Sequence, residues 1–474
     1  MGVFRSLKND DEKKTAAAGE ATVTEDAAAA DKKKSAKASA KQHYLTGKEI
    51  REIAKANSIE MRRLEKLKNR KLPESEYTTT MKDDGNILEI ENLHSYFFTD
   101  QGVVKAVDGV YFNVPLNSTV GVVGESGCGK SVTSMSVMRL LQGPTGQIVE
   151  GSIRFKAIDF KRDEQGKYIP VYERDENGEL VYENVTDKKG NPRLDKDGNP
   201  IRRPRQVRDE NGIGVFEKEE KVFDIAKMPI KEMYRLRGRQ MSMVFQEPMT
   251  SLNPVFTIGN QLDEVTSLHV PGATKDFAKK RSIEMLNMVG IAMPERVYAS
   301  YPHELSGGMR QRVMIAMALA CEPRLIIADE PTTALDVTIQ AQILDLFNDL
   351  KSRINGSILL ITHDLGVIAE MADYVVVMYA GRIIEQGTVS EIFHNPCHPY
   401  TQGLQKSKPT MNSSEDQLFN IPGNVPNPVD MPANCYFKER CSQCIGKCSG
   451  EYPGMVQVSP THFVACHLYA PKED

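Results

Sequence analysis

The stretch GESGCGKS, at residues 124–131, constrains the fold more than any other part of the chain. It follows the apolar run STVGVVG at 118–124 and precedes a segment with helical spacing, so a glycine-rich loop joins a buried strand to a helix. Glycines let the backbone wrap closely, and successive N–H groups then face phosphate oxygens at the positive end of the helix. The stretch predicts a phosphate-binding loop. Apolar runs at 325–329, 357–361 and 374–379, separated by helical segments, predict that it belongs to an α/β fold with a mainly parallel sheet.

Each residue type in this loop has a definite chemical role. The ammonium group of Lys130 can reach the β- and γ-phosphates of a nucleotide, and the hydroxyl of Ser131 can bind Mg²⁺. Cys128 lies inside the loop, and we interpret it as a small filler rather than a reactive thiol. The residues expected to contact the nucleotide here are Gly124, Glu125, Ser126, Gly127, Cys128, Gly129, Lys130, Ser131 and Val132.

A second chemical element is LIIADE at residues 325–330. The apolar run predicts a buried strand that delivers Asp329 at its end, where the carboxylate can hold the water shell of Mg²⁺. Glu330 follows directly and can polarise an attacking water. An ordinary strand ending in acidic turn residues is the alternative, and the phosphate loop upstream argues against it.

Composition excludes several classes of protein. The 474 residues carry a formal net charge of −4, which provides no global attraction to nucleic acid. No apolar run reaches the roughly 18 residues of a membrane-spanning helix. Residues 1–83 form an extension in which 1–44 are predicted to be disordered. Residues 46–71 predict a basic, weakly amphipathic helix. Such a helix could contact the acidic headgroups of a membrane or a partner protein, or it could be a solvated tail.

A polar insertion interrupts the α/β pattern between about residues 158 and 227. Asp-x-x-Gly turns recur there between short alternating runs, which predicts successive β-hairpins. The turn from Asp195 to Gly198 has some likeness to a calcium loop, but it lacks the downstream glutamate and the flanking helices, so a plain turn is expected.

Four further stretches resemble the motifs of ABC-transporter ATPases. VFQEP at 244–248 resembles the glutamine loop, LSGGMRQR at 305–312 the signature sequence, ALD at 334–336 the D-loop and ITHD at 361–364 the switch histidine. Together with the phosphate loop and the Asp-Glu strand, they occur in the order of that family. The resemblance covers about residues 86–470 apart from the insertion. It implies a P-loop NTPase fold over 84–395, with a helical subdomain at about 250–320.

The resemblance also implies the roles of individual residues. In that family two ATPase domains pack head to tail, and the signature sequence of one completes the ATP site of the other. Phe97 is expected to stack on adenine, with Tyr96 as the alternative. The implied catalytic residues are Glu330, His363, Gln246 and Lys130; the implied Mg²⁺ ligands are Ser131, Gln246 and Asp329; and further nucleotide contacts fall to Ser306, Gly307, Gly308 and Asp336.

GESGCGKSVTSMSVMRLL, VFQEPMTSLNP and NPCHPYTQGL narrow the resemblance to the ATPases of dipeptide and oligopeptide importers. Lys-Ser-Val-Thr at 130–133 resembles their D-type subunit. The implied protein hydrolyses ATP to energise peptide import. It pairs with a paralogous ATPase below two membrane permeases, at the cytoplasmic face of a bacterial membrane. An extracellular peptide-binding protein acts indirectly, and no nucleic acid is involved.

Three alternatives stay open beside that resemblance. The first is the ATPase of an importer for nickel or another small solute, because such a subunit does not touch the substrate. The second is a soluble, non-transport ABC ATPase that acts on ribosomes or DNA, although the chain has one such domain and no heptad run. The third is a non-hydrolysing regulatory subunit, which the intact Glu330 argues against.

Residues 396–474, predicted as a small C-terminal domain, hold a concentration of cysteines. Cys435, Cys441, Cys448 and Cys466 are spaced x5, x6 and x17 and match recurrent positions of the peptide-importer tail, whereas Cys444 is extra. Four thiolates suit a [4Fe–4S] cluster, which we favour, or Zn²⁺. Buried free thiols or disulfides are the alternatives. His462 and His467 could replace a cysteine as a metal ligand, but we favour a role as polar loop residues for both.

Overall fold

The computed structural model describes residues 46–187, 190–247, 251–333, 337–407, 419–429 and 431–470. The chain divides between Glu52 and Ile53 into two units, and the account below concerns the second. The segment predicted to be disordered at 1–44 lies outside the described residues, and so does the D-loop with Asp336.

The centre of the unit is an eight-stranded sheet in the order β14-β15-β13-β12-β4-β11-β10-β9. Five neighbouring strands run parallel, and nearly all of their residues are buried. This matches the continuous Val, Ile and Leu runs of the sequence, so the strands predicted at 325–329, 357–361 and 374–379 are confirmed. The five are β12 (Tyr374–Tyr379), β4 (Thr119–Val123), β11 (Ser357–Thr362), β10 (Leu325–Asp329) and β9 (Met241–Val244).

The other three strands extend this sheet in the antiparallel sense. β13 (Arg382–Thr388) pairs with β12, β15 (Phe463–Val464) pairs with β13, and β14 (Val456–Gln457) forms the edge. The cysteine-rich segment therefore contributes two short strands to the central sheet.

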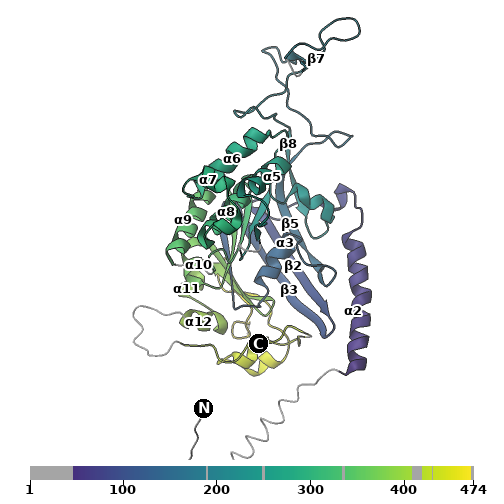
Figure 1. The fold of residues 1–474 in the computed structure, drawn as a ribbon. Helices are drawn as coiled ribbons and strands as arrows, with labels where there is room; N and C mark the ends of the chain where they lie inside the picture. The colour runs from purple at the N-terminus through teal and green to yellow at the C-terminus, as the bar shows by residue number, and fades with distance from the viewer. Residues whose placement is uncertain are drawn as a thin grey trace, which may run out of the picture. The chain divides into compact units, whose positions relative to one another are not determined.

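A second sheet of five antiparallel strands packs on the first, and the expectation of a mainly parallel sheet did not include it. Its order is β1-β8-β5-β2-β3, and its long strands pair over most of their length (Figure 1). The strands are β1 (Thr78–Thr79), β2 (Asn86–Thr99), β3 (Gly102–Pro115), β5 (Gly146–Phe160) and β8 (Lys218–Asp224).

The two faces of the central sheet bury two separate cores. Along β10, Ile326 and Ala328 belong to a cluster with the helices, whereas Leu325 and Ile327 belong to a cluster with the antiparallel sheet. Alternate side chains of a strand point to opposite faces, so one apolar strand serves both cores. The phosphate loop starts at the end of β4, between these two layers.

Helices connect the strands, and polar caps mark where several of them begin. Thr257, Thr274 and Ser306 each accept a backbone N–H at the start of a helix. None of the helices in the described ranges is long and apolar enough to cross a membrane. The helical turns are α2 (Gly47–Lys68), η1 (Glu74–Glu76), α3 (Lys130–Val137), η2 (Ile230–Arg235), α5 (Ile258–His269), α6 (Lys275–Met288), α7 (Pro294–Ala299), η3 (Pro302–Glu304), α8 (Gly307–Leu319), α9 (Val337–Ile354), α10 (Leu365–Met371), α11 (Val389–His394), α12 (Pro399–Lys406), η4 (Lys438–Arg440) and η5 (Gly446–Ser449).

The insertion is an arm of hairpins between β5 and β8, at residues 161–217 (Figure 1). It is shorter than predicted, because the two flanking strands continue to Phe160 and from Lys218. It contains β6 (Tyr182–Asn184) and β7 (Arg202–Pro204). The carboxylate of Asp195 accepts the N–H groups of Asp197 and Asn199 at 2.9 Å each, so this loop is a hydrogen-bonded turn.

Candidate nucleotide site

The phosphate loop leaves β4 and enters α3 through backbone conformations that glycine permits. Gly129 has φ +99°, and a Cβ there would lie 2.1 Å from the carbonyl oxygen of Ala106. Gly127 also has a positive φ, +79°, but faces open space. The thiol of Cys128 is buried beneath the loop, and burial raises its pKa, which fits the predicted filler role.

Two side chains of the loop are held in place by hydrogen bonds within the protein. The ammonium group of Lys130 is buried and donates to the carbonyl oxygens of Gly124 at 2.8 Å and Glu125 at 3.1 Å. Ser131 donates its hydroxyl to Asp329 Oδ1 at 2.9 Å. The loop therefore meets the end of β10, as the sequence predicts for a shared metal site.

Glu330 is the centre of a second cluster beside this pair. Gln246 donates to Glu330 Oε2 at 3.0 Å, and Thr333 donates to the same oxygen at 2.9 Å. His363 Nδ1 lies 3.4 Å from Glu330 Oε1. The ends of β9, β10 and β11 thus converge on one carboxylate, which gives it the surroundings of a group that orients water.

The backbone of Glu330 lies in the left-handed region, with φ +47°, which is rare for a residue with a side chain. Its N–H donates to the carbonyl of Ile361 at 2.8 Å and fixes the turn after β10. Burial raises the pKa of the adjacent Asp329, and the charge of Glu330 adds to this, while the Ser131 hydrogen bond opposes it. A cation between these groups would relieve their repulsion.

The signature residues lie elsewhere on the surface. Ser306 caps α8 by accepting the N–H of Met309 at 3.3 Å, and Ser306 and Gly307 are exposed. Among the hydrogen bonds between described residues, none joins Ser306, Gly307 or Gly308 to the phosphate loop.

The two aromatic candidates on β2 differ in their surroundings. The ring of Phe97 is half-buried against Gly146, where a Cβ would come within 2.8 Å of it. The hydroxyl of Tyr96 donates to Asp108 Oδ1 at 2.7 Å, so its ring is fixed in a polar network. Phe97 remains the better candidate for stacking on a base, because it has no such competing bond.

The C-terminal segment contacts the phosphate loop directly, which sequence patterns did not predict. The hydroxyl of Tyr400 accepts the backbone N–H of Glu125 at 2.8 Å. Arg440 lies 3.0 and 3.1 Å from the two carboxylate oxygens of Glu125. Tyr400 lies 275 residues and Arg440 lies 315 residues after Glu125 in the sequence, so no local sequence pattern could have predicted these contacts. The backbone N–H and the carboxylate of Glu125 are therefore both engaged by the C-terminal segment.

The cysteines of the C-terminal segment lie near one another as free thiols. The N–H of Cys435 donates to the carbonyl of Cys448 at 3.2 Å. Burial, and then the neighbouring thiols Cys435, Cys441 and Cys448, raise the pKa of Cys466 to about 11. Cys444 is exposed, and its pKa is raised by desolvation and then by its neighbours Cys448 and Cys441.

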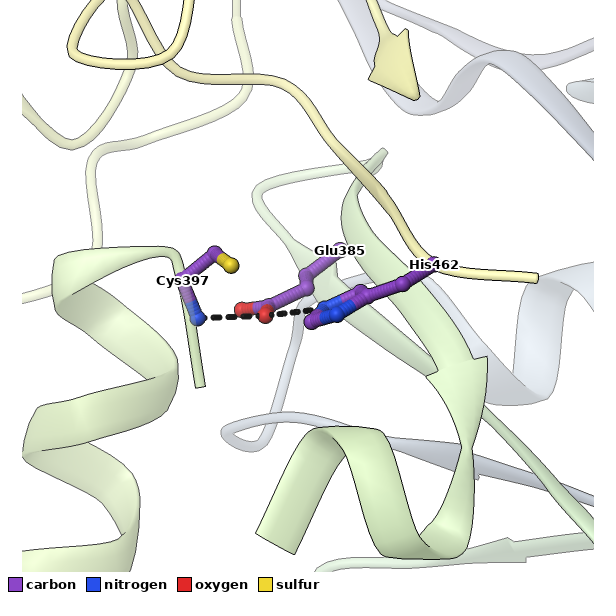
Figure 2. A group of neighbouring side chains, drawn as sticks. All are labelled: Glu385, Cys397 and His462. Atoms are coloured by element: carbon purple, nitrogen blue, oxygen red, sulfur yellow. Dashed lines mark hydrogen bonds and ion pairs between the residues drawn. The ribbon is translucent and has the colours of Figure 1, made fainter. Parts of the chain in front are cut away.

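A buried group that the sequence did not predict joins Glu385 on β13 with Cys397 and His462 (Figure 2). The Glu385 carboxylate accepts the N–H of Cys397 at 2.6 Å, the N–H of His398 at 2.9 Å, and a bond from His462 Nε2 at 2.8 Å. These three donors occupy the oxygens that a metal would need. We interpret the group as a hydrogen-bonded staple, so His462 does not serve the cysteines.

Comparison with known proteins places these features in a family. The family described as "ABC transporter" matches residues 107–221 and 197–333 of this chain. The family described as "Oligopeptide/dipeptide transporter, C-terminal region" matches residues 384–448. The oligopeptide transport ATP-binding protein AppD of Bacillus subtilis is 42% identical over 383 residues, which cover 81% of this chain and 97% of AppD. OppD of the same organism is 42% identical, covering 81% of this chain and 89% of OppD, and its dipeptide transport ATP-binding protein DppD is 40% identical, covering 81% and 94%.

Proposed function

Because the chain belongs to the family of ATP-binding proteins of oligopeptide and dipeptide ABC transporters, we propose that it hydrolyses ATP to drive peptide import through membrane permeases. The observation that carries this proposal is the convergence of Gln246, Thr333 and His363 on Glu330, next to the bonded pair of Ser131 and Asp329. A chain that only bound nucleotide would not need a carboxylate held in this way.

Each group of the site has a proposed task in hydrolysis. Lys130 exchanges its bonds with the loop carbonyls for the β- and γ-phosphates of ATP, whose charge it offsets. Ser131, Asp329 and Gln246 would hold Mg²⁺, which neutralises charge on the phosphate oxygens when bound. Glu330 orients the attacking water in line with the γ-phosphate. His363 contacts Glu330 and stabilises the charge that develops.

The exposed signature residues support a partner in the same reaction. We infer that Ser306, Gly307 and Gly308 contact ATP held by a paralogous ATPase subunit, and that Asp336 lies at the same interface. The pair would sit beneath two permeases at the cytoplasmic face of a bacterial membrane, with an extracellular peptide-binding protein as the source of substrate. Phe97 is proposed to stack on the adenine ring.

The cysteines are proposed to hold a [4Fe–4S] cluster through Cys435, Cys441, Cys448 and Cys466. A zinc–sulfur distance of about 2.3 Å keeps four tetrahedral sulfurs about 3.8 Å apart. Among the described residues the five thiols form no group of three within 4.8 Å of one another. What supports the cluster proposal is the set of four cysteines that the sequence brings together, since four thiolates are the usual ligands of a four-iron cluster.

The hydrolysis proposal is tested by Glu330→Gln, with the exposed Glu284→Gln as a matched control of equal charge change. The variant should bind ATP with near-normal affinity but turn over at least about 10²-fold more slowly, because the water loses its base while the phosphate contacts remain. Near-normal turnover would exclude the role of Glu330. If the wild-type protein did not bind ATP, the proposed function would be excluded altogether.

The proposed cluster and substrate need separate measurements. Protein purified without oxygen should show visible absorbance and about four iron atoms per chain, and both signals should fall in Cys441→Ser. A colourless, iron-free protein would contradict the cluster. For the substrate, the chain should co-purify with permeases that take up peptides from a mixed panel; uptake of nickel in place of peptides would favour the small-solute importer.

A further inference from the structure

Glu125, the second residue after β4, is held by two side chains from the C-terminal segment. Glu125 gives its backbone N–H to Tyr400 and its carboxylate to Arg440. Neither partner belongs to the nucleotide-binding motifs. Both contacts act at the point where the loop turns away from the sheet, so they bear directly on its shape.

Tyr400 is placed rigidly at this contact. Its side chain is fully buried, and its ring lies 4.8 Å from that of Tyr379 and 5.5 Å from that of Phe437, centroid to centroid. It sits in the first turn of α12, where His398 caps the helix by accepting the Tyr400 N–H at 3.0 Å. A ring packed on two others and a capped backbone leave the hydroxyl one position, facing the loop.

Arg440 is also fixed before it meets the carboxylate. Its Nε donates to the carbonyl of Pro422 at 3.0 Å, and a terminal nitrogen lies 3.4 Å from the carbonyl of Ile421. Arg440 is 9% exposed and the Glu125 side chain 28%, so water and salt reach the ion pair only from the side of the carboxylate. A planar guanidinium held by backbone carbonyls is preorganised for a carboxylate.

The backbone of Arg440 lies within the cysteine-rich turn. Lys438 N–H donates to the carbonyl of Cys435 at 3.3 Å, and Cys441 N–H donates to the carbonyl of Lys438 at 3.3 Å. Arg440 thus directly precedes Cys441 in this turn. A centre that held Cys435 and Cys441 would restrain the backbone from which the guanidinium reaches Glu125.

We propose that Tyr400 and Arg440 are positioning residues through which the cysteine-rich segment holds the phosphate loop in its nucleotide-binding shape. The proposal rests on the proposed function, since it concerns the same ATP site. Without Arg440, the Glu125 carboxylate is released beside the place of the phosphates and repels them. Without the Tyr400 hydroxyl, the Glu125 N–H has no partner and the first turn of the loop relaxes.

The proposal makes a distinct kinetic prediction. A misplaced phosphate loop weakens the binding of ATP and the binding of the transition state equally, because the phosphate contacts exist in both. The KM for ATP and the Kd of a non-hydrolysable fluorescent ATP analogue should therefore rise together. The kcat at saturating ATP should stay within about twofold of the wild-type value, since Glu330 is untouched.

The experiment compares Tyr400→Phe and Arg440→Met in the full chain with two matched controls. Tyr374→Phe removes a hydroxyl bonded to the carbonyl of Thr461, and Arg281→Met removes a guanidinium bonded to a carbonyl and to Glu322. We expect the Kd to rise about fivefold in Tyr400→Phe and about tenfold or more in Arg440→Met. The controls should stay within about twofold.

Two double variants show the route of the effect. Glu125→Gln with Arg440→Met should be less impaired than the two single changes added together, because both remove one contact. Cys441→Ser should raise the Kd in the wild-type background and add little to Arg440→Met. If Arg440→Met fails to fold, Arg440→Lys and Tyr400→Phe carry the test.

The possible failures are distinguishable. If the wild-type chain does not bind the ATP analogue, the proposed function is excluded, and so is the positioning role of Tyr400 and Arg440. If the wild-type chain binds it and Tyr400→Phe and the arginine variants bind it equally well, only the positioning role is excluded. A lower kcat at unchanged Kd would also overturn it, because the loop would then not set affinity.

Discussion

At the scale of single residues, the phosphate loop shows two different demands for glycine. Gly127 and Gly129 both have positive φ values, +79° and +99°. Only Gly129 also meets a neighbouring backbone, since a Cβ would lie 2.1 Å from the Ala106 oxygen. The carbonyl belongs to β3 and cannot swing aside as a flexible side chain could.

Gly129→Ala should therefore be more damaging than Gly127→Ala. Both variants incur the left-handed penalty of about 1–2 kcal/mol in the free energy of unfolding. Gly129→Ala adds a steric clash of about 2 kcal/mol and displaces the loop, so it should also lose ATP binding. Urea unfolding and ATP titration of both variants measure this; equal losses would show that the backbone contact is unimportant.

Much of the site at this scale follows from residue type and order. Gln246, Glu330 and His363 are far apart in the chain, yet each was predicted: Glu330 because it follows a buried apolar strand, and Gln246 and His363 because their motifs resemble those of ABC-transporter ATPases. The partners of Glu125 were not predictable in this way. Tyr400 and Arg440 reach it through tertiary packing, which leaves no periodic signal in the sequence.

At the scale of elements, the start of α12 depends on a buried, neutral histidine. His398 accepts the Tyr400 N–H with Nδ1, and burial lowers its pKa from 6.5 to about 4. The unfolded chain therefore binds a proton more readily than the folded chain between these values. Stability attributable to His398 is complete above pH 6.5 and falls as the pH drops toward 4.

His398→Asn should flatten this pH dependence, because asparagine can cap a helix without titrating. Between pH 7 and pH 5 the wild-type chain should lose about 2 kcal/mol more of its free energy of unfolding than the variant. Urea unfolding at both pH values measures the difference, and other titrating groups cancel in the comparison. Parallel losses in the two proteins would assign the acid sensitivity elsewhere.

The arm at 161–217 is an element that the core does not need. Phe160 and Lys218 are direct partners in the antiparallel pair of β5 and β8, so a two-residue Asn-Gly turn can join them. The shortened chain should keep cooperative unfolding and an ATPase rate within about twofold of wild type. It should lose about 2 kcal/mol of stability, since Phe160 loses its ring contacts with Tyr168 and Phe216.

The control for this deletion is a chain in which residues 161–217 are replaced by a flexible linker of equal length. A shortened chain that fails to fold while the linker chain folds would show a strained turn. Failure of both would show that the arm supports the core. The arm also explains why the second sheet was missed, because it separates β5 from β8 in sequence and hides their pairing.

At the scale of the whole molecule, the C-terminal segment closes the fold. It adds β14 and β15 to the central sheet and buries Glu385 of β13 beneath His462. The apolar strand runs predicted the parallel centre of that sheet. They could not predict its antiparallel extension, because strands of two residues carry no pattern.

His462→Ala should therefore destabilise the whole unit. The fully buried Glu385 carboxylate would lose one of its three donors, which should cost about 2–4 kcal/mol in the free energy of unfolding. His467→Ala, which removes only a bond to the exposed carbonyl of Glu451, should change it by about 0.5 kcal/mol or less. Equal effects of the two changes, measured by urea unfolding, would contradict the staple.

The contacts of Tyr400 and Arg440 with Glu125 also set an order of events during synthesis. A nascent chain exposes its phosphate loop to the cytosol long before residue 440 leaves the ribosome. Until then Glu125 lacks Arg440, even where Tyr400 has already emerged, and the central sheet lacks β14 and β15. A chain still being translated would hold ATP weakly and consume little of it. Completion of the cysteine-rich segment would be the step that makes the newly made subunit competent.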